Sequence, residues 1–581
     1  MEQRAKRKLS AILSADVKDY SRLMEQDELE TVRTLEAYRE MIAEVIRNYS
    51  GRVVDSPGDN VLAEFSSVVD AIECATEIQM ELKSKNEELP ENRRMEFRIG
   101  INLGDVIEQG ERIYGDGVNI AARIQNLAEA AGICISGNVY DQVKNKLALE
   151  YEYLGKHSVK NISDPVSVYQ VLMQQDVTLP GMDIETKLPD KASIAVLPFV
   201  NMSGDPEQEY FSDGITEDLI TDLSKVSGLF VIARNSVFTY KGRPVKINKV
   251  GRELGVRYVL EGSVRKSNHR IRITAQLVDT TTEGHLWAER YDRDLKDIFA
   301  LQDEVTRKIV GALAVKLTED ERKNLTNRYT DNLKAYDYYL RGLEYLYQFT
   351  EEANSQARDM FERAFELDPE FASAYAYLGL SHWMEWSMGW SQDPQSLERA
   401  FELAQRAIAR NYSLPEAHRT LGEVYLWKKQ HEQAIAEYET SVDLNPNYAD
   451  GIAGLGDVLS WSGRPEEAIG LVNKAMRLNP VYPTSYLWNL GHAYFLTRRP
   501  EEAIDALKRV LNRNPNFHPA HVYLAILYIE LGRTEEAGAE WTEFVRRSPG
   551  TSPDAWRQRI PYKDPAILER LFGALAKASL I

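Results

Sequence analysis

The chain has 581 residues, 43% hydrophobic and 27% charged, a composition that suits folded domains and a length that exceeds a single core. Its formal net charge of −19 would repel phosphate backbones and anionic membrane surfaces, which argues against a general nucleic-acid or membrane-surface binder. Cys74 and Cys134 lie in apolar runs and are expected to be buried free thiols, because two such residues support neither a disulfide framework nor a zinc site. We find no secretory signal and no stretch of about 18 apolar residues, so a cytoplasmic location is expected.

Residues 1–173 alternate β-type and α-type patterns and form the first predicted domain. Strands are predicted at 9–15, 52–55, 61–65, 95–103, 133–136 and 165–172, and helices at 28–47, at 68–83 and from Gly117 onward. The turn Ser56-Pro57-Gly58-Asp59 has the chemistry of a hairpin between the second and third strands. The order β-α-β-β-α-β predicts a ferredoxin-like core with additions.

Residues 174–192 lack periodicity and contain Pro180, Gly181 and Pro189, so we expect an interdomain linker there. Residues 193–320 return to an α/β pattern, which predicts a second domain. Its strands are predicted at 193–199, 230–233, 258–264 and 271–278, and its helices at 211–226, 250–254 and 301–317. The runs Ala195-Val196-Leu197-Pro198-Phe199 and Tyr258-Val259-Leu260-Glu261-Gly262-Ser263-Val264 resemble TolB and FlgO-like domains. These motifs are structural, so sensing or packing is the expected role.

A repeat of 34 or 35 residues runs through residues 332–549. Asn411, Asn445, Asn479 and Asn514 mark its phase, and each period holds a pair of helices, such as 449–462 with 465–478 and 484–496 with 500–512. The pattern resembles tetratricopeptide repeats, which implies a C-terminal α-solenoid of five or six helix pairs with a concave face. That face is expected to bind a protein or peptide partner or a second copy, and a rigid spacer without a ligand is the alternative.

Two irregular regions flank this repeat. The interval from Asp368 to Asn411 is longer than one period, so an insertion is expected there. Residues 550–581 are expected to form a C-terminal helical tail, with a helix at 565–579.

Two aspartates and an Asn/Arg pair carry the candidate chemistry of the first domain. Asp16 ends the first strand, Asp59 lies in the hairpin turn, and Asn119 and Arg123 lie one helical turn apart. Ring closure of a nucleoside triphosphate by its ribose 3′-oxygen can use two metal ions, and Mg²⁺ or Mn²⁺ prefers carboxylate oxygens. Arg123 can stabilise the developing negative charge, and Asn119 can orient the ribose.

In this order, the segments around these residues resemble the catalytic domain of the class III adenylate and guanylate cyclases over residues 8–173. The resemblance implies metal binding by Asp16 and Asp59, transition-state contacts by Asn119 and Arg123, and a triphosphate contact by Lys160. Sites of this family form between two catalytic domains. One such domain in the chain therefore implies a homodimer with two equivalent sites.

Three positions depart from the family's pattern. Asp55 stands where adenylate cyclases often have Lys, and Arg112 stands where Asp or Thr is common. An acidic acceptor with an Arg donor suits guanine or uracil, so GTP or UTP is favoured and ATP is the other candidate. Alternatively, Asp55 and Arg112 pair with each other across the dimer. Asp19 replaces a frequent Gly in a loop that approaches the phosphates.

Two functions therefore compete. The leading interpretation is a class III nucleotidyl cyclase that makes a 3′,5′-cyclic nucleotide and pyrophosphate for intracellular signalling, with the later domains regulating or localising it. The alternative is a catalytically weak or silent cyclase-like scaffold that binds protein partners through its repeats.

Overall fold

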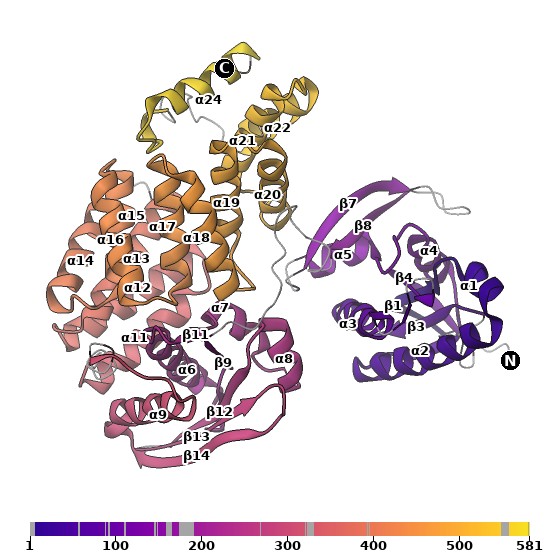
Figure 1. Ribbon diagram of the computed structural model, residues 1–581, viewed down its shortest axis with the longest axis horizontal. Helices are drawn as coiled ribbons and strands as arrows, with labels where there is room; N and C mark the ends of the chain where they lie inside the picture. Colours follow the sequence, from indigo (N-terminus) through magenta and orange to yellow (C-terminus); the bar gives the residue numbers. More distant parts are fainter. Residues whose placement is uncertain are drawn as a thin grey trace. The chain divides into compact units, whose positions relative to one another are not determined.

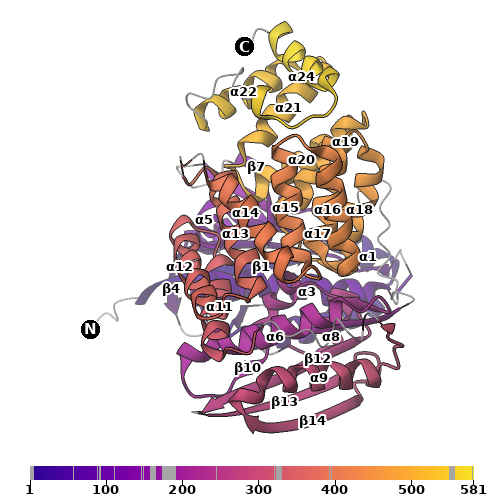
Figure 2. The same ribbon diagram turned by 90° about the vertical axis from the view of Figure 1, so that its left-hand side faces the viewer.

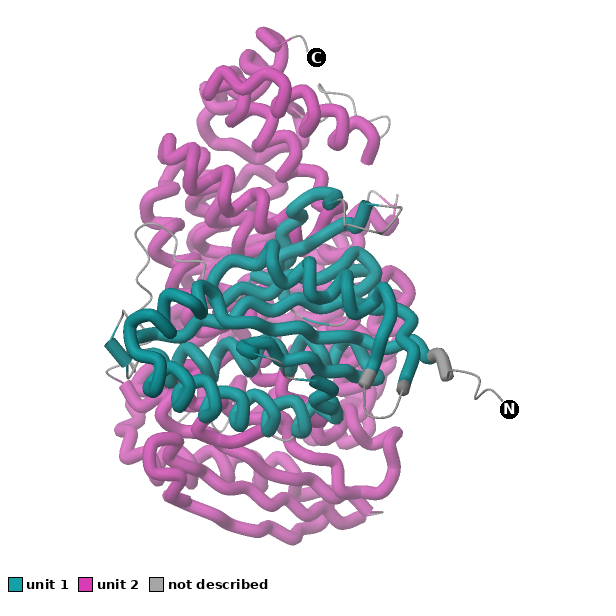
Figure 3. The backbone as a smooth tube through the Cα atoms, turned by 90° about the vertical axis from the view of Figure 1, so that its right-hand side faces the viewer, with its two compact units in different colours: residues 1–183 teal, residues 184–581 magenta. Residues whose placement is uncertain are grey.

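The computed structural model describes residues 6–581 except 56–57, 88, 91–92, 110–111, 145–146, 148, 158–164, 173–190, 244, 268, 320, 322–329, 392, 394, 548–556, 579 and 581. The chain divides into two compact units, residues 1–183 and 184–581 (Figure 3). Most of the predicted linker at 174–192 lies outside the described residues, and Ala192 already belongs to a strand. Among the helices described, none has the length and apolar content that a membrane crossing requires.

A mixed eight-stranded sheet is the framework of the first unit (Figure 1). Its strands are β1 (Lys6–Val17), β2 (Arg52–Asp55), β3 (Val61–Phe65), β4 (Phe97–Gln109), β5 (Arg112–Tyr114), β6 (Ile133–Ser136), β7 (Glu150–His157) and β8 (Val166–Leu172). They run in the order β2-β3-β1-β4-β6-β8-β7, and β5 pairs with β4. The antiparallel half β4-β1-β3-β2 has the ferredoxin-like strand order, so the predicted core is confirmed, and β6, β8 and β7 are additions to it.

Helices cover both faces of this sheet. They are α1 (Tyr20–Gln26), α2 (Glu28–Asn48), α3 (Val68–Glu87), α4 (Asp116–Gln125) and α5 (Gly137–Val143). Successive side chains of a strand point to opposite faces, so Leu13 joins the main core with α2 and α3, whereas Ile12 lies in a smaller cluster with Ala121 of α4. Cys74 and Cys134 are buried and free, as predicted, and burial raises the pKa of each thiol to about 12.

A second sheet opens the second unit, in the order β11-β9-β12-β13-β14 with β10 paired to β12. Its strands are β9 (Ala192–Val196), β10 (Val200–Asn201), β11 (Leu229–Val231), β12 (Tyr258–Ser267), β13 (Arg270–Asp279) and β14 (His285–Asp294), with helices α6 (Glu209–Ser224), α7 (Arg234–Val237), α8 (Ile247–Leu254) and α9 (Ile298–Ala312). The strands β11, β9 and β12 are parallel, and β12, β13 and β14 are antiparallel. This confirms the predicted α/β class of the region.

Six helix pairs follow in the described residues, which confirms the predicted α-solenoid. The pairs are α11 (Leu333–Leu346) with α12 (Glu351–Leu367), α13 (Ala372–Met388) with α14 (Ser396–Arg410), α15 (Pro415–Trp427) with α16 (His431–Leu444), α17 (Ala449–Trp461) with α18 (Pro465–Leu478), α19 (Thr484–Leu496) with α20 (Pro500–Arg513), and α21 (His518–Glu530) with α22 (Thr534–Arg547). The first helices of successive pairs pack on one another, and we call the side that they line the inner face of the solenoid. The lengthened period between Asp368 and Asn411 begins with a longer helix: α13 has 17 residues, whereas α15 has 13.

The α/β region of the second unit packs against the repeats, where α6 lies beside α11 (Figure 2). Two of the repeated asparagines take part in this contact. Asn445 Nδ2 donates to Ser224 Oγ at 2.7 Å, and Ser236 Oγ donates to Asn479 Oδ1 at 2.6 Å. A continuous hydrophobic core joins Leu219 of α6 with Leu340 of α11. The two parts therefore form one packed unit.

Candidate active site

Asp16 and Asp59 lie at the same edge of the first sheet. Strands β1 and β3 are antiparallel neighbours with Ala15 opposite Val61. Asp16 follows Ala15 directly, and Asp59 precedes Val61 by two residues, so both residues lie at the same end of this strand pair. This edge therefore carries two carboxylates, one on β1 and one in the turn before β3.

Arg98 of β4 holds Asp16 from the other side of β1. The two residues are direct partners in the β1–β4 register. Arg98 Nε donates to Asp16 Oδ1 at 3.1 Å, and its terminal nitrogen donates to Asp16 Oδ2 at 2.9 Å. Both side chains are largely covered, at 20% and 19% exposed. A bidentate guanidinium thus neutralises the first candidate metal ligand.

Arg39 of α2 fixes the turn that carries Asp59. Its guanidinium donates to the carbonyl oxygens of Gly58 and Asn60, the latter at 3.1 Å. Gly58 has φ of 62°, a left-handed conformation that glycine adopts at little cost. The backbone on both sides of Asp59 is therefore held from a helix that covers the sheet.

Asn119 and Arg123 are exposed on α4, one helical turn apart. The opposite side of α4 lies directly on the sheet. Gly100 of β4 permits this close approach, because a Cβ there would clash with the carbonyl oxygen of Ala121 and the backbone nitrogen of Gln125.

Two buried hydrogen bonds fix α4 along the sheet. Ser14 Oγ donates to Gln125 Oε1 at 2.5 Å, and Asn102 Nδ2 donates to the carbonyl oxygen of Gly117 at 3.1 Å. Ser14 lies on β1, two residues before Asp16. The strand that bears a candidate carboxylate and the helix that bears the Asn/Arg pair are therefore held together.

The remaining predicted residues are described only in part. Asp55 ends β2 and Arg112 begins β5; β3 and β1 separate β2 from β4 in the sheet, but parts of β2 and β5 approach each other. The side chain of Arg112 and the whole of Lys160 fall outside the described residues. Asp19 has φ of 56°, and its carbonyl oxygen accepts a hydrogen bond from the Arg22 N–H at 3.0 Å. The structure thus gives Asp19 the backbone conformation that favours the glycine common in the family.

The donor set at the sheet edge fits Mg²⁺ or Mn²⁺, because two carboxylates suffice when phosphates and water supply the other ligands. Across the residues that the structure describes, we find no group of three or more His, Cys, Asp or Glu that could hold a metal ion.

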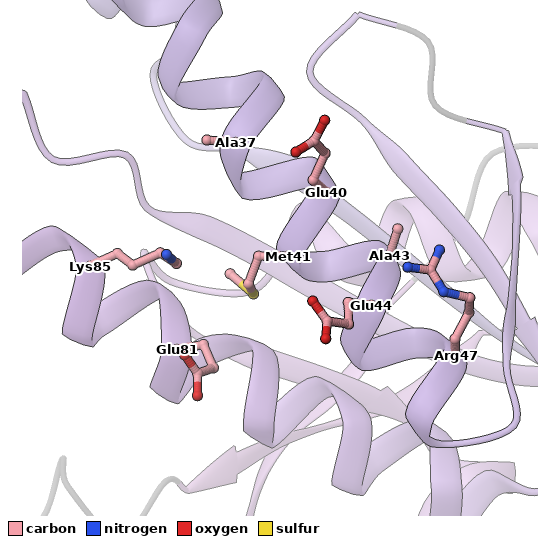
Figure 4. Close-up of a pocket in the computed structure, with 8 residues that line it drawn as sticks. All are labelled: Ala37, Glu40, Met41, Ala43, Glu44, Arg47, Glu81 and Lys85. Carbon is pink, nitrogen blue, oxygen red and sulfur yellow. The ribbon is translucent and has the colours of Figure 1, made fainter.

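A cavity of about 670 Å³ lies away from these residues, between α2 and α3 (Figure 4). Its lining is mostly charged and consists of Ala37, Glu40, Met41, Ala43, Glu44, Arg47, Glu81 and Lys85. It is an open hollow between two helices, and it contains none of the candidate catalytic side chains.

Comparison with known proteins supports the assignment of the first domain and of the repeats. Residues 3–173 match the adenylate and guanylate cyclase catalytic domain, and residues 415–448, 453–516 and 494–543 match tetratricopeptide repeats. Residues 190–308 match the second domain of HilA/YgeH-like transcriptional regulators, which supports a separate region there. The likeness of this region to TolB has only loose support.

Individual relatives carry cyclase names. The chain is 48% identical over 434 residues to "Putative adenylate cyclase 3" of Rhizobium meliloti (strain 1021), an alignment that covers 74% of each protein. It is 26% identical over 177 residues to "Adenylate cyclase 1" of the same organism, covering 27% of this chain and 26% of that protein. The crystal structure of an adenylate/guanylate cyclase/hydrolase from Silicibacter pomeroyi is 38% identical and covers 29% of this chain and 99% of that chain, with a TM-score of 0.28. With its cyclase domain and an extensive relative at this identity, the chain belongs to the adenylate and guanylate cyclase family of enzymes.

Proposed function

We propose that this enzyme converts a nucleoside triphosphate to a 3′,5′-cyclic nucleotide and pyrophosphate, with Asp16, Asp59, Asn119 and Arg123 as its catalytic set. The observation that carries the proposal is the placement of both aspartates at one sheet edge, by the β1–β3 register. Substrate and metal would meet at that edge.

Each side chain has a defined role in this proposal. Asp16 and Asp59 would bind Mg²⁺ or Mn²⁺, which lowers the pKa of the attacking 3′-hydroxyl and neutralises the leaving pyrophosphate. Arg123 stabilises the negative charge that develops around the α-phosphorus. Asn119 orients the ribose for in-line attack, and Lys160 pairs with the triphosphate.

A homodimer would complete the site. Asn119 and Arg123 are exposed in the single chain, where water screens the guanidinium charge and weakens its effect on a transition state. Tyr114 and Leu127 flank α4, and they are 47% and 38% exposed, as expected for side chains that a second copy covers. A two-fold dimer would bring α4 of one protomer to the aspartates of its partner and form two equivalent sites.

Two observations point to different bases for the substrate. The acidic Asp55 with Arg112 suits guanine or uracil, which favours GTP or UTP. The extensive relative is named an adenylate cyclase, which favours ATP. An assay must therefore offer every base to the same preparation.

The test is product formation by the purified full chain with Mg²⁺ or Mn²⁺ and, separately, ATP, GTP, CTP and UTP. Mass spectrometry should find one cyclic nucleotide, with pyrophosphate released in equal amount. Asp16→Ala and Asp59→Ala should abolish it, and Arg123→Ala should slow it by about 10²–10³, as for loss of one charge-stabilising group. Asp141→Ala is the matched control, because Asp141 is an exposed aspartate of α5 paired with Lys144.

A silent cyclase-like scaffold is the second candidate, and the Asp16–Arg98 pair favours it because that pair satisfies the carboxylate without a metal. A folded, dimeric protein that makes no product from any of the four nucleotides would overturn the cyclase proposal and leave the scaffold.

A further inference from the structure

The segment 557–563 lies against the inner face of the repeats, just before the terminal helix α24 (Pro565–Lys577). The guanidinium carbon of Arg559 lies 4.7 Å from the ring centre of Trp386 and 5.9 Å from that of Trp427. Cation–π contacts of this kind between a guanidinium and indole faces are favourable and depend on position. Arg559 is thus held by two tryptophans from different repeats.

Tyr562 enters a closed pocket three residues further on. It is 6% exposed, and its ring centre lies 4.6 Å from that of Trp461. The hydroxyl group of Tyr562 is 2.7 Å from both His492 Nε2 and the Tyr523 hydroxyl. Burial lowers the pKa of His492 to about 3, so a neutral imidazole meets the phenol. The pocket therefore satisfies both the ring and the hydroxyl group of a tyrosine.

Contacts on either side of these two anchors also hold the segment. The Lys563 N–H donates to the carbonyl oxygen of Trp461 at 3.1 Å. Lys429 Nζ donates to the carbonyl oxygen of Gln558 at 2.8 Å, and the Lys563 ammonium pairs with Glu432. Residues 557–559 are helical and residues 560–562 have no regular structure. Side-chain anchors combined with main-chain hydrogen bonds are a common means by which proteins bind peptides.

The surface that residues 557–563 contact extends over four successive repeats. Trp386, Trp427, Trp461 and His492 belong to α13, α15, α17 and α19, the first helices of their pairs, and we call them the aromatic row. They contact one another in sequence, with ring centres 5.2 Å apart for Trp386 and Trp427, 6.5 Å for Trp427 and Trp461, and 4.2 Å for Trp461 and His492.

Two carboxyl groups lie on the same helices, and burial raises the pKa of both, that of Asp457 to about 8. Glu423 and Asp457 stand one turn before Trp427 and Trp461, and Trp461 Nε1 donates to Asp457 Oδ2 at 3.1 Å. At neutral pH the Asp457 carboxyl is therefore mostly protonated, and the preference of this surface for a basic and aromatic ligand rests on the indole faces around Arg559 and the partners of the Tyr562 hydroxyl group.

We propose that the aromatic row is a peptide-binding site, that residues 559–563 occupy it as an internal ligand, and that a partner protein with an Arg-x-x-Tyr segment displaces them. A tethered segment competes at an effective concentration on the order of millimolar, so it suppresses binding of the partner until it is released. The inference is independent of the cyclase chemistry, because it concerns the repeats alone.

The test uses a fluorescein-labelled peptide with the sequence of residues 557–563 and fluorescence anisotropy with the full chain. The double variant Arg559→Ala, Tyr562→Ala empties both anchors and should bind the peptide at least tenfold more tightly than the unaltered protein. Arg557→Ala is the matched control: Arg557 lies over the ring of Phe572 and pairs with Glu569, outside the aromatic row, so its affinity should be unchanged.

Further arms establish where the peptide binds and whether the protein is folded. Adding Trp427→Ala to the double variant should abolish binding, as should replacing Arg and Tyr of the peptide by Ala. Circular dichroism checks the fold, and Arg559→Gln alone, which keeps the Tyr562 anchor, should still raise the affinity several-fold. Equal affinity of the unaltered protein and both opened variants, or binding that survives Trp427→Ala, would show that residues 557–563 are only a structural cap.

Discussion

At the residue scale, Asp16 has two competing partners. The guanidinium of Arg98 occupies both of its oxygens in the structure, whereas the proposed chemistry needs at least one of them for a metal. Charge-assisted bonds of this kind contribute about 1.5–3 kcal/mol, so the pair opposes metal binding measurably. In the proposed site, Arg98 therefore sets the cation concentration at which Asp16 would bind a metal.

Replacing Arg98 should tighten metal binding in the absence of nucleotide. For Arg98→Gln we expect Mn²⁺ to bind about tenfold more tightly, which corresponds to ~1.4 kcal/mol. Electron paramagnetic resonance of free Mn²⁺ measures this without any turnover. Arg93→Gln, which loses an exposed ion pair with Asp27, is the control and should change nothing. Unchanged or weaker Mn²⁺ binding would mean that Arg98 supports the site rather than competing for it.

At the element scale, the position of α4 depends on how closely it approaches β4. Gly100 removes the side chain that would separate them, since a Cβ there would clash with backbone atoms of Ala121 and Gln125. Backbone atoms, unlike side chains, have no alternative rotamer that would relieve the clash. A larger residue at position 100 must therefore push α4 away from the sheet. Asn119 and Arg123 move with α4, and catalytic geometry tolerates little displacement.

Gly100→Ala should therefore reduce turnover far more than its effect on folding explains. We expect a loss of about 100-fold in kcat, as for a displacement near 1 Å, with destabilisation of about 1–3 kcal/mol from overpacking. Product assays and urea unfolding measure the two effects. Gly470→Ala is the control, because a Cβ there meets open space on α18. A variant that unfolds easily but keeps full kcat would refute the argument.

Prediction from sequence succeeded where local signals agreed. Helix α18 was placed correctly because Pro465 marks its start and Asn479 its end. The edge strands β7 and β14 were missed, because their exposed charged residues weaken the apolar alternation. The order of the motifs along the chain was enough to single out Asp16 and Asp59. Arg98 and Arg39 are far from them in the sequence, and only the tertiary structure brings these arginines to the two segments. Knowledge of the β1–β4 pairing would have identified Arg98, and no local signal marks Arg39.

At the scale of the whole molecule, a buried carboxyl joins the two parts of the second unit. Asp218 of α6 accepts hydrogen bonds from Gln302 of α9, at 2.6 Å, and from the hydroxyl group of Tyr336 of α11. The α/β region and the first repeat thus share a buried polar contact inside their common core. Burial is the main cause that raises the pKa of Asp218 from 3.8 to about 7. The carboxyl is therefore protonated more readily in the folded protein than in the unfolded chain.

This difference predicts that the second unit loses stability as the pH rises. The folded pKa is the higher one, so the stabilising contribution of Asp218 is complete below pH 4 and is lost as the pH rises toward 7. The loss is at most about 4 kcal/mol, from 1.36 kcal/mol for each pKa unit. Asp218→Asn keeps a neutral acceptor for Gln302 and Tyr336, so its stability should vary less between pH 5 and pH 8.

Urea unfolding of the full chain at pH 5 and pH 8 measures this effect. Because Asp218 contacts both parts, the α/β region and the repeats should lose stability together, in one transition that shifts with pH. Glu207→Gln, which changes an exposed carboxylate of the same region, should retain the pH dependence of the unaltered protein. Parallel pH profiles for Asp218→Asn and the unaltered protein would show that this carboxyl does not link the two parts to pH.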